Sequence, residues 1–345
     1  MSMDDDPVSN PSSNESFDDV VQHMSRRSFM RGGLAAAAGA AAFVGADAVM
    51  HAAPVSADGG DDDHHDHHHG SLLGFTGIPV SSEDAVIVAE GYTAEVLIAW
   101  GDPVSDGPEF APDASNSTAD QELQWGMHND GLVYFPINGS KRGLIVQNHE
   151  YTDDGLLFAD GVANWTADKT DKSLAAHGVS VIEVRKRRGS WQVVRPSKYG
   201  RRITGNTPMS VSGPAAGHPL LQTSVDPTGA EVLGTLNNCA MGFTPWGTYL
   251  ACEENFNGYF RKTAPPNALE ARYGLNAAGF GYLWHTTHPR FQIDSEPNEP
   301  NRFGWVVEID PWDPESKPIK RTMLGRCKHE AAKTVEAKDG RIVGV

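Results

Sequence analysis

Short apolar runs separated by turn residues make up most of the chain beyond residue 84. Such runs, rich in β-branched and aromatic residues and bounded by Gly, Pro, Asn and Asp, are typical of β-strands. No convincing amphipathic helical pattern follows residue 80, so the sequence predicts an all-β fold. The predicted strand segments are 84–100, 131–137, 142–152, 178–194, 247–255, 302–312 and 339–345. Within segment 178–194, "VSVIEV" and "WQVV" joined by Arg-Gly-Ser predict a hairpin.

Two of these segments share a register that ends in an acid. Glu150 follows Gly143 by seven residues, and Glu254 follows Gly247 by the same number. In a β-propeller the inner strands run along one central channel, so acids at their ends would converge. The two copies are about a hundred residues apart, which is longer than one ordinary propeller blade. Either the repeat extends over two blades, or the match is a local coincidence. A β-sandwich is the alternative architecture.

The stretch "GTYLACEENFNGYF", residues 247–260, places two adjacent carboxylates directly after a buried-looking strand. Burying unpaired carboxylates costs several kcal/mol each, so stability alone gives no reason for Glu253 and Glu254. A multivalent cation at the strand end would offset this cost. If the strand alternates regularly, one of the two acids faces the cation, and the register shared with Glu150 favours Glu254.

Two further polar clusters add candidate ligands. In "GTLNNCAMGFTPWG" Cys239 follows two asparagines, and in "GRCKHEAA" His329 and Glu330 lie beside a second cysteine. Carboxylates suit calcium, whereas a lone thiolate among carboxylates suits a transition metal such as iron. The spacing does not fit a structural zinc site. His149 and His329, taken singly, are better explained as buried structural histidines.

Composition narrows the class of protein. The 345 residues carry a formal net charge of −17, which argues against a nucleic-acid partner and suits a protein that handles cations. The three cysteines leave at least one thiol without an intramolecular partner. No P-loop, dinucleotide-binding fingerprint or nucleophile elbow is present in a convincing context.

The N-terminal part has the pattern of an export signal. Arg26 and Arg27 precede an Ala- and Gly-rich run that ends in Ala46-Asp47-Ala48. This predicts a twin-arginine signal peptide over residues 1–48, recognised by the twin-arginine translocation machinery. The run is too short and too rich in Ala and Gly for a stable membrane span. Residues 49–71, with their Asp/His tract, predict a disordered linker, with metal scavenging as the alternative. The folded domain is predicted over 72–345, in the periplasm or outside the cell.

The chain resembles the PhoX family of alkaline phosphatases. The resemblance rests on the twin-arginine leader and on "NHEYT", "NNCAMGFTPWGTYLACEENFNGYF", "GWVVEIDP" and "GRCKHEAA". It implies a β-propeller with a mixed calcium and iron (Ca²⁺, Fe³⁺) cluster that hydrolyses small phosphomonoesters, with diesters as a further possibility. The attacking group would be an oxygen nucleophile bound to the cluster, so no side chain is assigned as catalytic.

Carried over to this sequence, the resemblance implies a role for each motif residue. Cys239 would be an iron-ligating thiolate, and Glu330 a carboxylate ligand of the iron pair. Glu150 and the pair Glu253 and Glu254 would be ligands on the calcium side. Asn148 and His329 would be ligands or supporting partners.

The chain departs from the family in length. Family members continue well beyond residue 345, where this chain stops in mid-strand, so we expect an N-terminal portion with an incomplete propeller. This leaves open whether the chain is active alone. Two alternatives are a calcium-stabilised, non-catalytic propeller that acts as a binding module and a calcium-dependent lactonase-type hydrolase. Iron together with calcium would favour the phosphatase.

Overall fold

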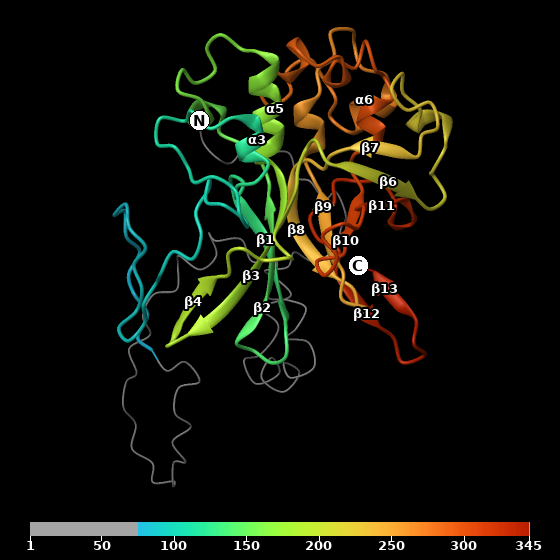
Figure 1. The fold of residues 1–345 in the computed structure, drawn as a ribbon. Coiled ribbons are helices and arrows are strands. Elements are labelled where there is room, and N and C mark those ends of the chain that lie inside the picture. The colour runs from blue at the N-terminus through green and yellow to red at the C-terminus, as the bar shows by residue number, and fades with distance from the viewer. Residues whose placement is uncertain (1–74, 345) are drawn as a thin grey trace, which may run out of the picture. The chain divides into compact units, whose positions relative to one another are not determined.

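A computed structural model describes residues 75–344, almost all of them within the compact unit Gly77–Val345 (Figure 1). The predicted signal peptide 1–48 with Arg26 and Arg27, and the predicted linker 49–71, lie outside the described residues. Both therefore remain predictions, as does the start of the domain at residue 72.

The first sheet has five strands and is antiparallel throughout. Its path runs β1-β2-β3-β4, and β5 pairs with the other end of β3. The predicted hairpin over 178–194 is confirmed as β3 and β4. The strands are β1 (Asn129–Pro136), β2 (Arg142–His149), β3 (Gly178–Arg187), β4 (Ser190–Val193) and β5 (Arg201–Ile203).

The second sheet has six strands in the order β7-β6-β11-β10-β9-β8, and its one parallel pair is β6 with β11. A separate pair, β12 with β13, follows near the C-terminus. The strands are β6 (Pro208–Ser212), β7 (Glu231–Leu233), β8 (Asn238–Phe243), β9 (Tyr249–Glu253), β10 (Val306–Ile309), β11 (Ile319–Arg321), β12 (Thr334–Glu336) and β13 (Ile342–Gly344).

Short helices connect these strands. The α-helices are α3 (Thr118–Gln121), α4 (Asp154–Leu157), α5 (Ala167–Ala176) and α6 (Ala268–Arg272). The 3₁₀ turns are η2 (Pro219–Leu221), η3 (Phe256–Tyr259), η4 (Trp284–Thr286), η5 (Pro289–Phe291), η6 (Glu299–Arg302) and η7 (Thr322–Leu324).

Helix α5 is a helix of 10 residues in a part of the chain where the sequence shows no convincing amphipathic pattern. Thr166 caps it by accepting a hydrogen bond from the backbone N–H of Lys169. The helix was missed because its buried face is made largely of polar and small residues, among them Thr170, Lys172 and Ser173. An apolar periodicity search cannot find such a face.

The predicted strand over 84–100 is wrong. This segment is irregular in the structure, and its apolar side chains are largely solvent-exposed, with Val86 at 82% and Val96 at 87% exposure. A strand needs a partner edge for its backbone hydrogen bonds. The segment has the composition of a strand but acquires no such partner among the described residues.

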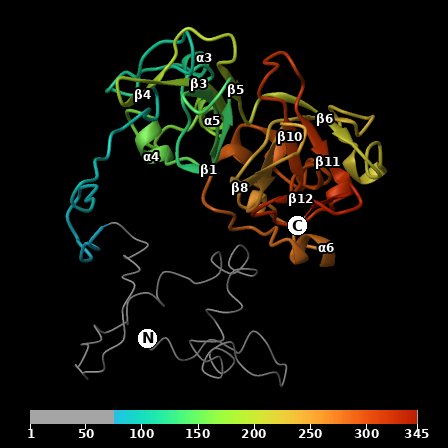
Figure 2. The same ribbon diagram turned by 90° about the horizontal axis from the view of Figure 1, so that it is seen from below.

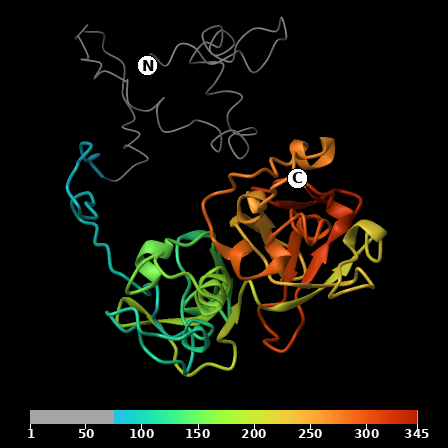
Figure 3. The same cartoon turned by 90° about the horizontal axis from the view of Figure 1, so that it is seen from above.

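The two large sheets lie side by side, as Figure 2 and Figure 3 show from below and from above. One apolar core contains residues of both, including Leu144 and Val181 from the first sheet and Ala251 and Val307 from the second. Strands β1 and β8 are in contact across the junction. Nearby, Oη of Tyr249 on β9 lies 3.0 Å from the carbonyl oxygen of Gly131 on β1. The core thus fixes the two sheets relative to each other.

The described residues are mostly β, as the sequence predicts. Strands β1–β4 form a four-stranded antiparallel meander, and β8–β11 form another. Within residues 75–344 these sheets do not close into a ring, so the propeller stays a prediction. Over the same residues, no helix combines the length and apolar character needed to cross a bilayer.

Candidate metal centre

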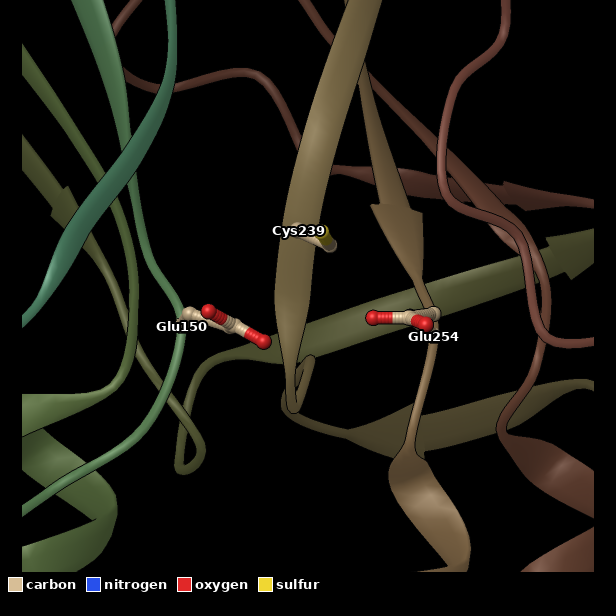
Figure 4. Close-up of side chains that lie close together, drawn as sticks. All are labelled: Glu150, Cys239 and Glu254. Carbon is tan, nitrogen blue, oxygen red and sulfur yellow. The ribbon is translucent and has the colours of Figure 1, made fainter. Parts of the chain in front are cut away.

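Glu150, Cys239 and Glu254 converge at the junction of the two sheets. One potential ligand atom from each lies within 4.8 Å of the others. Glu150 directly follows β2, Glu254 directly follows β9, and Cys239 lies on β8. Figure 4 shows the two carboxylates pointing toward each other, with Cys239 beside them. Residues 104 positions apart are thus brought to one point.

The two hairpins that meet here have the same irregularity. The ladder of β1 with β2 shifts register between Asn129 and Leu132, and Asp130 lies inside this bulge. The ladder of β8 with β9 shifts in the same way just after Asn238, and Cys239 lies inside that bulge. A bulge adds one residue to a strand and redirects its side chain. Asp130 and Cys239 therefore occupy corresponding positions.

The residues before the bulges also correspond. His128 and Asn237 both have left-handed backbone conformations, with φ of 45° and 51°. The carbonyl of His128 accepts a hydrogen bond from the backbone N–H of Glu150, and that of Asn237 accepts from Glu254, each at 3.0 Å. The seven-residue spacing from Gly to Glu that the sequence shows twice therefore reflects a structural repeat. One copy lies in the meander β1–β4 and the other in the meander β8–β11.

Asp130 is the site residue that the sequence reading missed. The thiol of Cys239 donates to Asp130 Oδ2 at 3.7 Å. The only sequence signal for Asp130 is that "HND" at the start of β1 corresponds to "NNC" at the start of β8. This correspondence becomes visible once the two hairpins are compared strand by strand.

The site is electrostatically unfavourable without a cation. Burial raises the pKa of Glu150 to about 7, with Asp130 and Glu254 adding to the shift. Burial also raises the pKa of the Cys239 thiol, again with contributions from neighbouring carboxylates. Positive charge placed among these groups would favour their ionised, ligating forms. The donor set, carboxylates with one thiol, therefore fits a bound metal.

Glu253 is not part of this group. Its carboxylate lies on the other face of β9 and forms a fully buried ion pair with Lys320 at 2.7 Å. Its Oε2 also accepts from the backbone N–H groups of Gly304 and Trp305, at 3.0 and 3.1 Å. Burial lowers the pKa of Lys320 to about 8. The assignment of Glu253 as a metal ligand is corrected, because strand alternation points it away from Glu254.

Asn148 supports the site rather than lining it. The buried side-chain amide donates to the carbonyls of Cys239 and Ala240 at 2.6 and 3.1 Å. Its oxygen accepts from Tyr249 Oη at 2.8 Å. Both ends of the amide are therefore occupied, and Asn148 anchors the β8 bulge to β2. Of the two roles predicted for it, this geometry matches the supporting one.

Glu330 and His329 precede β12 and lie outside the group of three. Glu330 is exposed, but its charge contributes to the raised pKa of Glu150, which places it near the site. His329 Nε2 lies 3.0 Å from the carbonyl of Gly325, so this ring nitrogen is already engaged. The ligand role of Glu330 stays a prediction.

His149 is a buried structural histidine, as the sequence allows. Its Nε2 lies 2.6 Å from Ser180 Oγ, and burial lowers its pKa well below the ordinary value. A neutral, hydrogen-bonded imidazole of this kind packs the interior of the first sheet.

Comparisons with known proteins show the family of the chain. The family model for "Alkaline phosphatase PhoX" matches residues 73–344. The chain belongs to the PhoX family. A solved structure of Pseudomonas fluorescens PhoX, in complex with vanadate, a transition state analogue, is similar at 48% sequence identity and a TM-score of 0.77. The match covers 79% of this chain and 48% of that one, so the chain spans about half the length of this PhoX relative. Among curated proteins, no match was found.

Proposed function

We propose that this chain is the metal-binding part of an exported PhoX-type alkaline phosphatase that hydrolyses small phosphomonoesters. The observation that carries the proposal is the convergence of Glu150, Cys239 and Glu254 in a chain of this family. The related Pseudomonas fluorescens protein, solved with a transition-state analogue, supports phosphoryl chemistry as the reaction class.

The proposed metals are iron and calcium. The thiolate of Cys239 suits iron, and the carboxylates of Glu150, Glu254 and Asp130 suit calcium. Among the described residues, no Lys or Arg side chain forms an ion pair with any of these three carboxylates. Their charge is therefore left for a cation to balance. Glu330 is proposed as a further ligand.

The chain's own residues hold this arrangement in place. The bulges of β1 and β8 direct Asp130 and Cys239 to the junction, and Asn148 ties the second bulge to β2. Metal ions bound here would neutralise the carboxylates, attract a phosphate dianion and stabilise charge that develops in phosphoryl transfer. Because the ligands come from both sheets, the packing between the sheets sets the geometry of the site.

The proposed architecture of the whole protein is a β-propeller. The two four-stranded meanders resemble successive blades, and their first strands, β1 and β8, contact each other as inner strands of neighbouring blades do. An experimental structure of the protein with all of its strands would test whether the meanders are blades of one closed ring. Strands of the two meanders lining separate sides of a sandwich would contradict it.

Export is proposed on the twin-arginine pattern alone. Replacing Arg26 and Arg27 by lysine should leave the protein in the cytoplasm, whereas the unaltered chain should reach the periplasm or the medium. Fractionation followed by immunodetection measures this. Unchanged export of the double variant would contradict the proposal.

The deciding experiment combines metal analysis with an assay. The folded chain, reconstituted with iron and calcium, is analysed for both metals and tested on a chromogenic phosphomonoester with and without chelator. Iron and calcium with chelator-sensitive hydrolysis would support the phosphatase. Calcium without iron, and no hydrolysis, would favour the binding module or the lactonase-type reading. Cys239→Ala should remove iron and activity together, and retention of both would contradict the ligand assignment.

A further inference from the structure

A cleft of about 580 Å³ opens directly beside the candidate metal centre. Glu150 belongs to both, because its carboxylate lies in the group of three and its side chain also lines the cleft. A phosphate held at the centre would therefore direct its ester-linked alcohol toward this space. The chemistry of the cleft walls then bears on which alcohols are accepted.

Aromatic side chains form the walls. His128 and Tyr151 stack with ring centroids 3.8 Å apart and an interplanar angle of 11°. Tyr151 is 42% exposed and Phe280 55% exposed, so their rings are accessible from the cleft. Tyr282 is held rigidly, because its hydroxyl accepts from the backbone N–H of Thr152 and donates to the carbonyl of the same residue.

The charged groups in the cleft are acidic. Apart from Glu150, whose charge the proposed metal would balance, the carboxylates of Asp153 and Asp154 line it, and no Lys or Arg is among the lining residues that the structure describes. Asp153 caps α4 through one oxygen. Burial lowers the pKa of the neighbouring His128, and the charge of Asp153 only partly opposes this shift, so the neutral imidazole is favoured. Asp154 is buried and accepts from Thr152 and Ser173. The cleft therefore combines aromatic faces with negative charge.

We propose that this cleft recognises the alcohol part of the substrate and prefers alcohols that carry an ammonium group, with choline phosphate as the representative substrate. Proteins bind quaternary ammonium groups against the faces of aromatic rings, and nearby carboxylates add electrostatic attraction. Anionic alcohols would be disfavoured by the same carboxylates. This inference rests on the proposed phosphatase function, since the cleft is assigned to the leaving group.

The test uses a matched pair of substrates on the metal-loaded chain. Choline phosphate is compared with its neutral isostere, in which a tert-butyl group replaces the trimethylammonium group. We expect kcat/KM to be about tenfold higher for the cationic substrate, the size of effect that one or two desolvated cation–π contacts provide. Equal values, or a preference for the neutral ester, would overturn the inference while leaving the phosphatase function intact.

A binding measurement separates this inference from the proposed function. Calorimetry with choline and with its neutral alcohol isostere requires no hydrolysis, so it applies even if the chain turns over no phosphoester. We expect choline to bind about tenfold more tightly than the isostere. If the chain hydrolyses phosphoesters but shows no preference for choline in binding or turnover, the inference is wrong.

Substitutions locate the preference in the cleft. Tyr151→Leu and Asp153→Asn should each reduce the choline-to-isostere ratio by about threefold or more, as loss of one aromatic face or one charge predicts. Asp168→Asn is the control, because Asp168 is an exposed acid on α5 that does not line this cleft. A ratio unchanged in both cleft variants would contradict the assignment.

Discussion

The hydroxyl of Tyr259 donates a hydrogen bond to the backbone carbonyl of Glu150, 3.2 Å away. The same hydroxyl accepts from Asn237 Nδ2 at 3.3 Å and lies 3.1 Å from His177 Nε2. Because the carbonyl of Asn237 holds the backbone of Glu254, one buried tyrosine connects the supports of both converging acids.

Tyr259→Phe should therefore weaken the metal centre as well as the fold. Removing the hydroxyl leaves buried polar partners unsatisfied, which costs about 1–3 kcal/mol. Urea unfolding measures this loss, and metal analysis should show a lower metal content in the folded variant. Tyr199→Phe, at a tyrosine that lines neither the centre nor the cleft, is the control. Full metal content in Tyr259→Phe would show that the tyrosine has no role beyond packing.

The same substitution should have different effects at the adjacent residues Glu253 and Glu254. Glu253→Gln leaves the buried ammonium of Lys320 without its ionic partner, which should lower the free energy of unfolding by about 3–5 kcal/mol. Glu254→Gln should leave the stability of the metal-free chain unchanged or slightly higher, because it removes repulsion from Glu150, but it should reduce metal content. Denaturant unfolding with chelator, and metal analysis without it, distinguish the two. Similar behaviour of both variants would contradict the assigned faces of β9.

Asp130→Asn tests the residue found only in the structure. We expect the metal affinity of the variant to fall by about tenfold or more, since one anionic donor near Cys239 is lost. Glu109→Gln serves as the matched control, because Glu109 is exposed and lies outside the strands that carry the bulges. Competition with a chelating dye measures the affinity. Equal affinities of Asp130→Asn and the unaltered chain would remove Asp130 from the site.

Asp154 should make the stability of the metal-free chain depend on pH. Burial raises its pKa to about 6 from an ordinary value of 3.8. The folded state therefore binds the proton more tightly than the unfolded state does, and this contribution to stability is lost as pH rises from about 4 to 6. The loss is about 2–3 kcal/mol.

Comparing Asp154→Asn with the unaltered chain isolates this contribution. Urea unfolding of both proteins with chelator, at pH values across that window, should show a smaller decline of stability with rising pH in the variant. Parallel curves would mean that Asp154 titrates at its ordinary pKa.

Much of the strand content could be predicted from local pattern. The segments at 131–137, 142–152, 178–194, 247–255, 302–312 and 339–345 all contain strands, because alternation and turn residues act over a few neighbouring positions. The convergence of Glu150 and Glu254 was also foreseeable, since a shared register places both at the ends of equivalent strands. The same reasoning favoured Glu254 over Glu253.

Other features depend on contacts between distant segments. The strand pattern at 84–100 has no partner edge, and helix α5 buries polar residues that no apolar periodicity reveals. Asp130 becomes a site residue only because its bulge corresponds to that of Cys239.

The sequence by itself determined which residues form strands, which acids follow them and which family the motifs indicate, because these properties are written in local order and spacing. The tertiary structure decided that Lys320 neutralises Glu253, that Asp130 approaches Cys239 and that aromatic rings and carboxylates enclose a cleft beside Glu150. These contacts depend on which sheets pack together. Packing brings together residues that are far apart along the chain, and the local sequence around each of them does not indicate its partner.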